Sequence, residues 1–370
     1  MKFVCDGMIL SEAALTVSKA CSAKTTTPIL ECIKMKAEND GLTLTAYDGE
    51  ISIEKKILAE VIEEGELCVN GKTFADFVNK ISSFEVVIVS NENGIAIRYA
   101  DSESYMQTLS AEDFPRFGDK NTEGKNYFEI TEGELKSLIA RTVFCCATDD
   151  SRPILRGCLL EAKKDKLQAT ALDGFRMAFT ECQASAGVGE MEIVCPARTL
   201  IEISRMLEGG DEPLKIYADK NLMFVAVKNT VITSRLYTGK FIARENIYPT
   251  EFTSVVNVKR AEMVESIERA SILIRNDKNN LIWLDIKNGK IVVTANSEMG
   301  KVEEAVEGSL EGKEIKIAVN YKFILDALKA LDEETVTISL LREISPFVLK
   351  NGSGMGSKYL VLPLRAGSQS

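Results

Sequence analysis

The residues of this chain that could do chemistry are carboxylates, lysines and cysteines, because the sequence contains no histidine. Without histidine the chain lacks the commonest general base, the usual serine and cysteine protease arrangements and most zinc sites. Carboxylate or lysine catalysis stays open, and the paired acids Glu63-Glu64, Asp149-Asp150 and Glu303-Glu304 could serve it. A catalytic pair should occur once and lie in a cleft, and no pair in the sequence has that character. We therefore predict no catalytic residue and a protein that is not an enzyme.

The sequence gives no sign of a metal or a nucleotide. Nine cysteines are scattered without a CxxC pair, which suits a reducing cytoplasm and carries no zinc signature. Gly71-Lys72-Thr73 follows a predicted strand and precedes a predicted helix, as a phosphate-binding loop would. That pattern needs a glycine five positions earlier, where Glu66 stands. We expect an ordinary strand-to-helix turn, no metal and no cofactor.

Basic residues recur on the predicted helices, although the net charge is −10. That charge argues against a protein that grips nucleic acid over its whole surface, but it leaves room for one basic patch. Two interpretations remain open: solvated helix faces with i,i+4 charge pairs, or helices that direct basic residues at one shared polyanion such as DNA. Under the second interpretation, in which the helices face DNA, the DNA-facing helix residues are Lys72, Lys80, Lys136, Arg141, Arg198 and Arg205.

The segment Leu167–Thr180 predicts two strands around a turn at Asp173-Gly174, because glycine tolerates a positive φ. Asp48-Gly49 stands at a similar turn, but Glu50–Ser52 follow it, whereas Phe175–Met177 follow Asp173-Gly174. Two large apolar groups and an arginine beside a turn suit a shallow groove that binds a short peptide. Ordinary packing between domains is the alternative.

The same two-stranded design occurs three times along the chain. Leu42–Ile53 and Ile291–Glu304 resemble the segment around Asp173, and Thr45, Thr170 and Thr294 are separated by 125 and 124 residues. A period this long indicates a whole domain rather than a solenoid unit.

Other elements keep the same spacing. Thr27–Leu30 returns as Arg152–Leu155 after 125 residues, and Val69–Lys72 returns as Cys195–Arg198 and then as Val319–Lys322, after 126 and 124 residues. We therefore predict three tandem copies of one domain, with boundaries at 1–120, 126–246 and 251–366.

Each copy is predicted to supply two helices and seven or eight strands, an α+β fold with predominantly antiparallel sheet. In copy one we expect a strand at Ile29–Ala37, a helix at Thr73–Ile81 and an edge strand at Ser104–Ser110. In copy two a helix at Thr131–Cys145 begins with a capping box formed by Thr131 and Glu134. The last of three final strands is expected to end at Leu364.

Two linkers join the copies. Ala111–Lys125 is polar, whereas Tyr237–Thr250 contains Phe241, Ile242 and Ile247, so the second linker is expected to pack on another surface. No apolar run approaches the length of a membrane span and the N-terminus has no signal-peptide layout, which favours a cytoplasmic protein.

Over residues 1–365 the chain resembles the bacterial DNA polymerase III beta subunits, the sliding clamps. The resemblance rests on the order of the motifs and on the threefold repeat together. The motifs are MKF at the start, TTTPIL, AEDFP at 111–115, ALDGFRMA at 171–178, MLEGGDEPL at 206–214, the NYKFILDAL helix and the terminal YLVLPLR.

This resemblance implies a processivity factor for DNA replication. It implies a head-to-tail homodimeric ring with helices lining a hole and sheets outside, closed like most homo-oligomers. Such a ring encircles duplex DNA without reading its sequence. It tethers the replicative polymerase, and binds the clamp loader and repair proteins, through short peptide motifs.

The family's functional residues carry over by position. The peptide-binding pocket falls on Leu155, Leu172, Gly174, Phe175, Arg176, Met177, Ile242, Ile247, Leu360, Leu362, Pro363, Leu364 and Arg365. The DNA-facing loop positions fall on Lys24, Arg152 and Asn246, and the subunit contact on Met106 and Thr108 of one chain with Ile272 and Leu273 of the other. Phe175 replaces a common histidine and Ile242 a common proline. We expect a partner peptide to lie between the Leu172–Met177 turn and the Leu360–Leu364 strand, with Arg176 and Arg365 at the rim.

Overall fold

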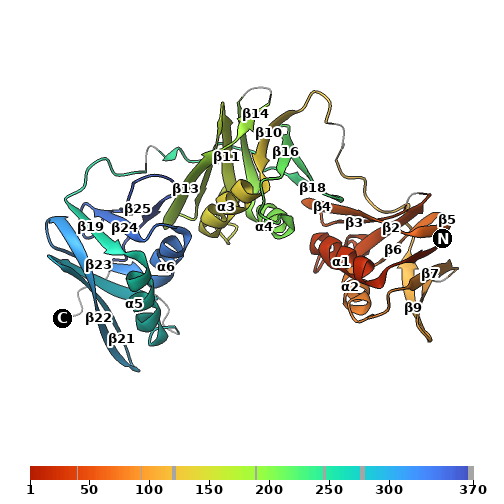
Figure 1. The fold of residues 1–370 in the computed structure, drawn as a ribbon, viewed down its shortest axis with the longest axis horizontal. Coiled ribbons are helices and arrows are strands. Elements are labelled where there is room, and N and C mark those ends of the chain that lie inside the picture. The colour runs from red at the N-terminus through yellow and green to blue at the C-terminus, as the bar shows by residue number, and fades with distance from the viewer. Residues whose placement is uncertain are drawn as a thin grey trace. The chain divides into compact units, whose positions relative to one another are not determined.

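The computed structural model describes residues 1–39, 41–92, 94–118, 122–187, 190–244, 247–275 and 280–365. The chain folds into two compact units. Unit 1 comprises residues 1–129, 205–208 and 212–236, and unit 2 comprises residues 130–204, 209–211 and 237 onward. Figure 1 shows the elements in order along the chain. Copy two is divided between the units, so the boundaries of the compact units differ from those of the repeats.

One order of elements occurs three times, which confirms the three tandem copies. Copy one contains β1 (Lys2–Cys5), α1 (Gly7–Val17), β2 (Cys32–Glu38), β3 (Gly41–Tyr47), β4 (Ile51–Ile57), β5 (Glu60–Glu63), β6 (Gly65–Asn70), α2 (Gly71–Val78), β7 (Val86–Asn91), β8 (Gly94–Tyr99) and β9 (Ser102–Leu109).

Copies two and three repeat this order, except that copy three has no counterpart of the short β5 or β14 in the described residues. Copy two contains β10 (Asn126–Thr131), α3 (Glu132–Thr142), β11 (Gly157–Lys163), β12 (Lys166–Leu172), β13 (Arg176–Gln183), β14 (Ser185–Ala186), β15 (Met191–Pro196), α4 (Ala197–Met206), β16 (Pro213–Ala218), β17 (Leu222–Val227) and β18 (Thr230–Arg235). Copy three contains β19 (Ser254–Lys259), α5 (Arg260–Ile272), β20 (Leu281–Lys287), β21 (Lys290–Ser297), β22 (Gly300–Gly312), β23 (Ile315–Asn320), α6 (Tyr321–Ala330), β24 (Thr335–Leu340), β25 (Phe347–Asn351) and β26 (Lys358–Val361).

Sheets continue from one copy into the next. Unit 2 holds a 12-stranded sheet in the order β15-β11-β12-β13-β26-β25-β24-β19-β22-β21-β20-β23, and copies two and three meet in it at the antiparallel pair β13–β26. In unit 1 the antiparallel pair β4–β18 joins copy one to the last strands of copy two. Helices α1 and α2 pack against each other, as do α5 and α6 (Figure 1).

Local sequence explains the elements. On α1 the buried residues Leu10, Ala13, Ala14 and Val17 recur at helical spacing, and the Asp6 side chain caps the helix by accepting from the amides of Met8 and Ile9. Strand β20 alternates between buried and half-buried residues, as expected of a strand with one face on the core. The Thr131 hydroxyl accepts from the Glu134 amide at 3.3 Å, which confirms the predicted helix start.

The Asp-Gly turns of copies one and two have the same construction. Asp173 Oδ1 accepts from the amides of Phe175 and Arg176 at 2.9 Å, and Gly174 has φ +92°. Asp48 Oδ1 accepts in the same way from the two residues after Gly49, whose φ is +105°. Glycine is needed because a Cβ is strained at these φ values.

Several predicted boundaries were wrong. The strand predicted at Ile29–Ala37 begins only at Cys32, because Pro28–Glu31 forms a 3₁₀ turn with proline at its first position, where the missing amide costs nothing. Pro153–Arg156 forms the same turn at the corresponding place in copy two. Helix α3 ends at Thr142 and continues as a 3₁₀ turn to Cys145.

Some strand ends also differ from the predicted ones. The final strand ends at Val361 rather than Leu364, and Phe175 lies in the turn before β13 rather than in a strand. The predicted edge strand at Ser104–Ser110 corresponds to β9, which pairs with β8 over Ser102–Gln107 and with β6 at Thr108 and Leu109. Among the described strands it therefore has an open edge over Ser102–Gln107, and its end connects β8 to β6 in one sheet.

Candidate peptide-binding pocket

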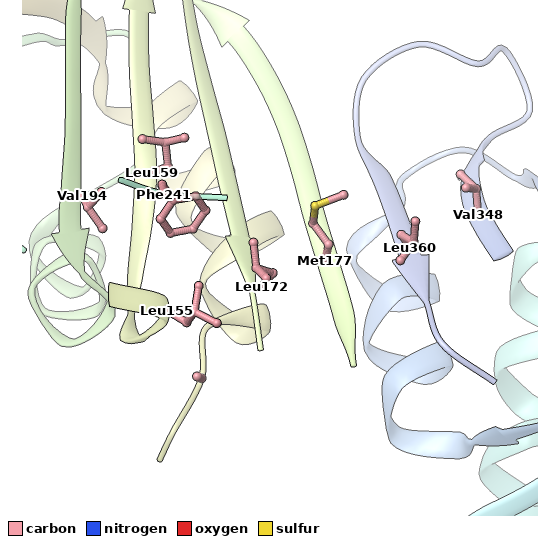
Figure 2. Close-up of a cluster of buried hydrophobic side chains, with 9 residues drawn as sticks. Leu155, Leu159, Leu172, Met177, Val194, Phe241, Val348 and Leu360 are labelled. Carbon is pink, nitrogen blue, oxygen red and sulfur yellow. The ribbon is translucent and has the colours of Figure 1, made fainter. Parts of the chain in front are cut away.

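Four apolar residues lie directly opposite one another across four adjacent strands of unit 2. The antiparallel register pairs Leu172 with Met177, Met177 with Leu360 and Leu360 with Val348. We call this set the apolar row; each of its residues is at most 5% exposed. Figure 2 shows these side chains on neighbouring strands where copies two and three meet. The floor of the predicted pocket is therefore built by pairing between copies.

The second linker covers this floor. Phe241 is buried in the same cluster as Leu155 and the apolar row, and Ile242, Ile247 and Tyr248 pack against it. The prediction that the apolar residues of Tyr237–Thr250 pack on another surface is confirmed. Burial raises the pKa of the Tyr248 phenol, which stays neutral near this apolar surface.

Hydrogen bonds join the C-terminal segment to the turn before β13 and to β23. The Leu362 amide donates to the Phe175 carbonyl at 2.9 Å, and the Leu364 amide donates to the Ala318 carbonyl at 2.7 Å. These bonds hold the segment after β26 in place beyond the end of the strand. Phe175 is 61% exposed and its ring lies 6.3 Å from that of Phe323, so it offers an accessible aromatic surface.

Arg176 differs from the expectation of a rim residue. Its Nε lies 3.0 Å from Asp173 Oδ2, Nη1 lies 2.7 Å from Asp326 Oδ2, and Nη2 donates to the Phe144 carbonyl at 2.7 Å. The guanidinium also lies over the Phe144 and Phe323 rings. Burial alone would lower the pKa of Arg176, but hydrogen bonds to Asp326 and Asp173 hold it above its ordinary value. Arg176 thus joins the turn of copy two to α6 of copy three.

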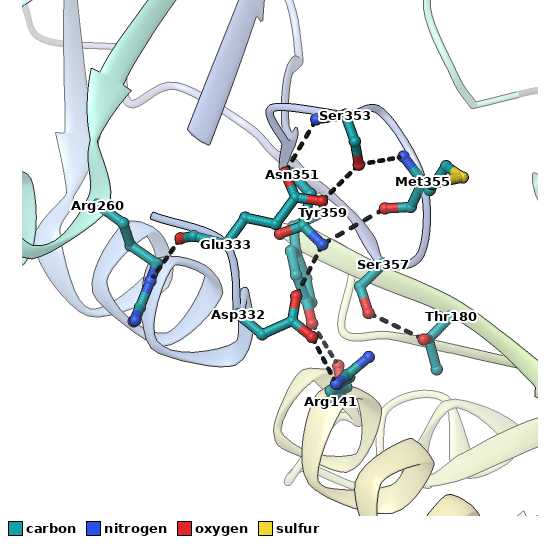
Figure 3. Close-up of polar contacts among 10 residues, drawn as sticks. All are labelled: Arg141, Thr180, Arg260, Asp332, Glu333, Asn351, Ser353, Met355, Ser357 and Tyr359. Carbon is teal, nitrogen blue, oxygen red and sulfur yellow. Dashed lines mark hydrogen bonds and ion pairs between the residues drawn. The ribbon is translucent and has the colours of Figure 1, made fainter. Parts of the chain in front are cut away.

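A second polar cluster also joins copies two and three (Figure 3). Arg141 Nη2 lies 2.9 Å from Asp332 Oδ2, and Asn351 donates to Asp332 Oδ1 at 2.8 Å. The Tyr359 hydroxyl donates to the Arg141 carbonyl at 3.0 Å, and Thr180 and Ser357 share a hydrogen bond of 2.9 Å. The hydrogen bond from Asn351, together with Arg141, holds the pKa of Asp332 below its usual value.

The structure brings most of the predicted pocket residues together. Leu155, Leu172, Met177 and Leu360 form the buried floor, Ile242 and Ile247 cover it, and Leu362, Pro363 and Leu364 are half-buried after β26. Gly174 and Phe175 form the turn, and Arg365 is exposed. Sequence reasoning missed Val348 and Tyr248. Tyr248 lies in a linker already noted as apolar, but only the β25–β26 register reveals Val348.

The predicted DNA-facing residues fall into three groups. Lys24, Lys72, Lys80, Arg152, Arg198 and Arg205 are exposed. Lys136 is half-buried, and Arg141 is half-buried and paired with Asp332, so Arg141 is less available to a phosphate than expected. Asn246 lies outside the described residues.

The predicted subunit-contact residues lie on strand β9 and at the end of helix α5. Met106 and Thr108 are half-buried on β9, beside Tyr105, which is 67% exposed. Ile272 is 58% exposed at the end of α5, and Leu273 follows it. An added Cβ at Gly300 would lie 3.9 Å from Leu273 Cδ1, so this side chain reaches the start of β22.

The acids considered for catalysis are partly engaged in ion pairs. Asp150 pairs with Arg156, and Glu304 Oε2 lies 2.7 Å from Arg269. Hydrogen bonds from Ser151 lower the pKa of Asp149, which is the opposite of what a general acid needs. No cluster of three or more candidate metal ligands occurs among the described residues, and none of the described helices is long and apolar enough to cross a membrane.

Three family models of the DNA polymerase III beta subunit match the chain in sequence. The N-terminal domain matches residues 1–118, the central domain residues 129–242 and the C-terminal domain residues 245–365. The boundaries predicted from the repeat stay a prediction.

Whole-length relatives agree with these matches. The chain is 34% identical to the beta sliding clamp of Halalkalibacterium halodurans and 31% identical to that of Bacillus subtilis, covering 99% of this chain and 100% of each relative. The crystal structure of the Bacillus subtilis sliding clamp superposes with a TM-score of 0.93 at 30% identity, over 99% of this chain and 100% of that one. The beta subunit of Streptococcus pyogenes gives 0.90 at 25% identity, with the same coverage.

The prediction that the chain is not an enzyme is confirmed, because these relatives are sliding clamps, which are non-catalytic. Three domain matches, similarity over the whole chain and the threefold order of elements lead to one assignment. The chain belongs to the DNA polymerase III beta subunit family, the bacterial sliding clamps.

Proposed function

We propose that this chain is a processivity factor of DNA replication that forms a closed head-to-tail homodimer around duplex DNA. One observation carries the proposal: the chain contains all three domains of the family in order, each with the same element order. The ring slides along DNA without reading sequence. It tethers the replicative polymerase, and binds the clamp loader and repair proteins, through the pocket at the apolar row.

Two open strand edges support the dimer. Over Ser102–Gln107, β9 pairs only with β8 among the described strands, and over 300–307 β22 pairs only with β21 among them. An open edge presents unpaired amides and carbonyls that favour pairing with another chain. We propose that β9 of one protomer pairs with β22 of its partner. Ile272 and Tyr105, both exposed in a single chain, then become covered.

Exposed basic residues on helices and loops support phosphate-directed binding of DNA. Lys72 lies in the first turn of α2 and Lys80 two residues after its end, and Lys24 and Arg152 lie in the loops before the 3₁₀ turns Pro28–Glu31 and Pro153–Arg156. Spread charges interleaved with acids favour weak, sequence-independent contacts. Binding of the free ring to linear duplex should therefore fall steeply with salt and show no preference for sequence. A tight site-specific complex at physiological salt is incompatible with the proposal.

The decisive experiment is retention on DNA of defined topology. The protein is loaded on nicked circular plasmid by a clamp loader, separated from free protein by gel filtration and challenged with a restriction enzyme that cuts once. We expect it to stay on the circle and to leave after linearisation. Equal retention on circular and linear DNA would mean ordinary binding rather than encirclement.

A further inference from the structure

Beside the apolar row lies a cavity of about 440 Å³, here called the basic cavity. Its lining includes three cationic side chains and three aromatic ones: Arg244, Lys350, Lys358, Phe179, Tyr248 and Phe252. Val348 lines it as well and also belongs to the apolar row, so the basic cavity and the predicted peptide pocket share a wall. All of these residues belong to unit 2.

The strand register places the two lysines directly opposite each other. Lys350 of β25 pairs with Lys358 of β26, and Lys358 pairs with Phe179 of β13. Each lysine lies two residues along its strand from a member of the apolar row, Val348 or Leu360, and so on the same face of the sheet. Two residues of strand span about 6.6 Å. A peptide seated on the apolar row therefore reaches the lysines within one or two residues.

Like charges directly opposite across a sheet destabilise it. Among the described residues neither Lys350 nor Lys358 has an ion pair within 4 Å, and the described lining of the cavity contains no carboxylate. Arg244 is engaged differently: it lies over the Phe179 ring at 4.3 Å, donates to Gln168 at 3.0 Å and lies 3.5 Å from Glu161. The two lysines are half-buried beside aromatic walls, where a charge is screened less than in open water.

We propose that the basic cavity binds an acidic side chain of the partner peptide, one or two residues from the apolar side chain seated on the apolar row. The carboxylate lies between Lys350 and Lys358 and relieves their repulsion. This inference rests on the proposed function of the neighbouring pocket. It adds a specificity determinant: partners with glutamate or aspartate at that position bind more tightly than otherwise identical neutral partners.

The test uses three fluorescent peptides, acetylated and amidated so that no terminal charge remains. All share a central Leu-Ala-Leu-Phe segment. The first peptide carries Glu-Glu before this segment, the second carries Glu-Glu after it, and the third carries Gln-Gln on both sides. Their dissociation constants are measured by anisotropy on the full-length protein at low and high salt. The double variant Lys350→Gln/Lys358→Gln removes the proposed partners. Lys290→Gln/Lys313→Gln removes two exposed lysines of copy three and is the charge-matched control.

One acidic peptide should bind the unmodified protein about threefold to tenfold more tightly than the neutral one at low salt. High salt should shrink the difference. The preference should vanish in the Lys350/Lys358 variant and persist in the control. Equal binding of acidic and neutral peptides, or a preference that survives loss of both lysines, overturns the proposal. Failure of every peptide to bind overturns the pocket itself, and this inference with it, so the two failures are distinguishable.

Discussion

Met177 and Leu360 lie directly opposite each other in the β13–β26 pair, where the sheet of copy two continues into copy three. Met177 is 1% exposed and Leu360 is 3% exposed. The same two side chains therefore hold the copies together and form the floor of the proposed pocket. Changing them alters stability as well as binding.

We expect Met177→Ala to destabilise unit 2 by about 2–5 kcal/mol, because truncation of a buried methionine leaves a cavity. The single tryptophan, Trp283, lies on β20 of unit 2, so its fluorescence during urea unfolding reports on that unit. Met299→Ala is the matched control, since Met299 is 75% exposed and should cost less than about 0.5 kcal/mol. Equal losses in the two variants would contradict the burial assigned to Met177.

Peptide binding is better tested at Leu362, which is half-buried after β26 and outside the β13–β26 pair. Leu362→Asp should abolish binding of a polymerase-derived peptide, because a carboxylate is costly against an apolar ligand. The variant should still dimerise and stay on circular DNA. Leu58→Asp, at an exposed leucine of unit 1, should bind the peptide normally. Unchanged affinity of Leu362→Asp would place the pocket elsewhere.

Ile272→Asp should weaken the dimer, because the proposed interface covers this 58% exposed side chain. Burial of an unpaired carboxylate there costs several kcal/mol, enough to shift the monomer–dimer equilibrium by orders of magnitude. Analytical ultracentrifugation at nanomolar concentration measures the shift. Met355→Asp, at an exposed methionine of unit 2, controls for the added charge. A dimer as stable as the unmodified one would argue against this edge.

The lowered pKa of Asp332 makes part of the stability of unit 2 depend on pH. Since the folded-state pKa lies below the ordinary value of 3.8, the stabilisation is fully present above that value and is lost as pH falls through the folded pKa. The stability difference between the unmodified protein and Asp332→Asn should therefore be constant near neutral pH and shrink below about pH 4. Urea unfolding at several pH values measures it. A difference that grows on acidification contradicts the assigned contacts.

The buried thiols should be unreactive. Burial raises the pKa of Cys5, Cys68 and Cys158 to about 12, so almost no thiolate is present at pH 8. A thiol-specific chromogenic reagent should react slowly with the native protein and with all nine cysteines in guanidinium chloride. Burial also raises the pKa of Cys21 and Cys182 to about 12, but these two thiols are only half-buried and should therefore be the first to react. A buried thiol that reacts as fast as free cysteine would contradict the structure.

The sequence by itself determined the threefold repeat, the order of elements and the family. The repeat and the family follow from matches along the whole sequence, whereas the elements themselves depend on local signals. Turns at Asp48-Gly49 and Asp173-Gly174 are specified by glycine conformation and by a side-chain oxygen that bonds amides two and three residues ahead. The apolar residues of the second linker were also sufficient to predict that it packs on another surface.

Only the tertiary structure decided which distant residues meet. The pairings of Met177 with Leu360 and of Lys350 with Lys358 depend on strand register, which is set by the packing of whole sheets rather than by neighbouring residues. Arg176 was expected at the rim of a groove, but its charge is satisfied jointly by Asp173, three residues earlier, and by Asp326, 150 residues later. A local pattern identifies an arginine beside a turn, whereas the position of its partner depends on how copies two and three pack together.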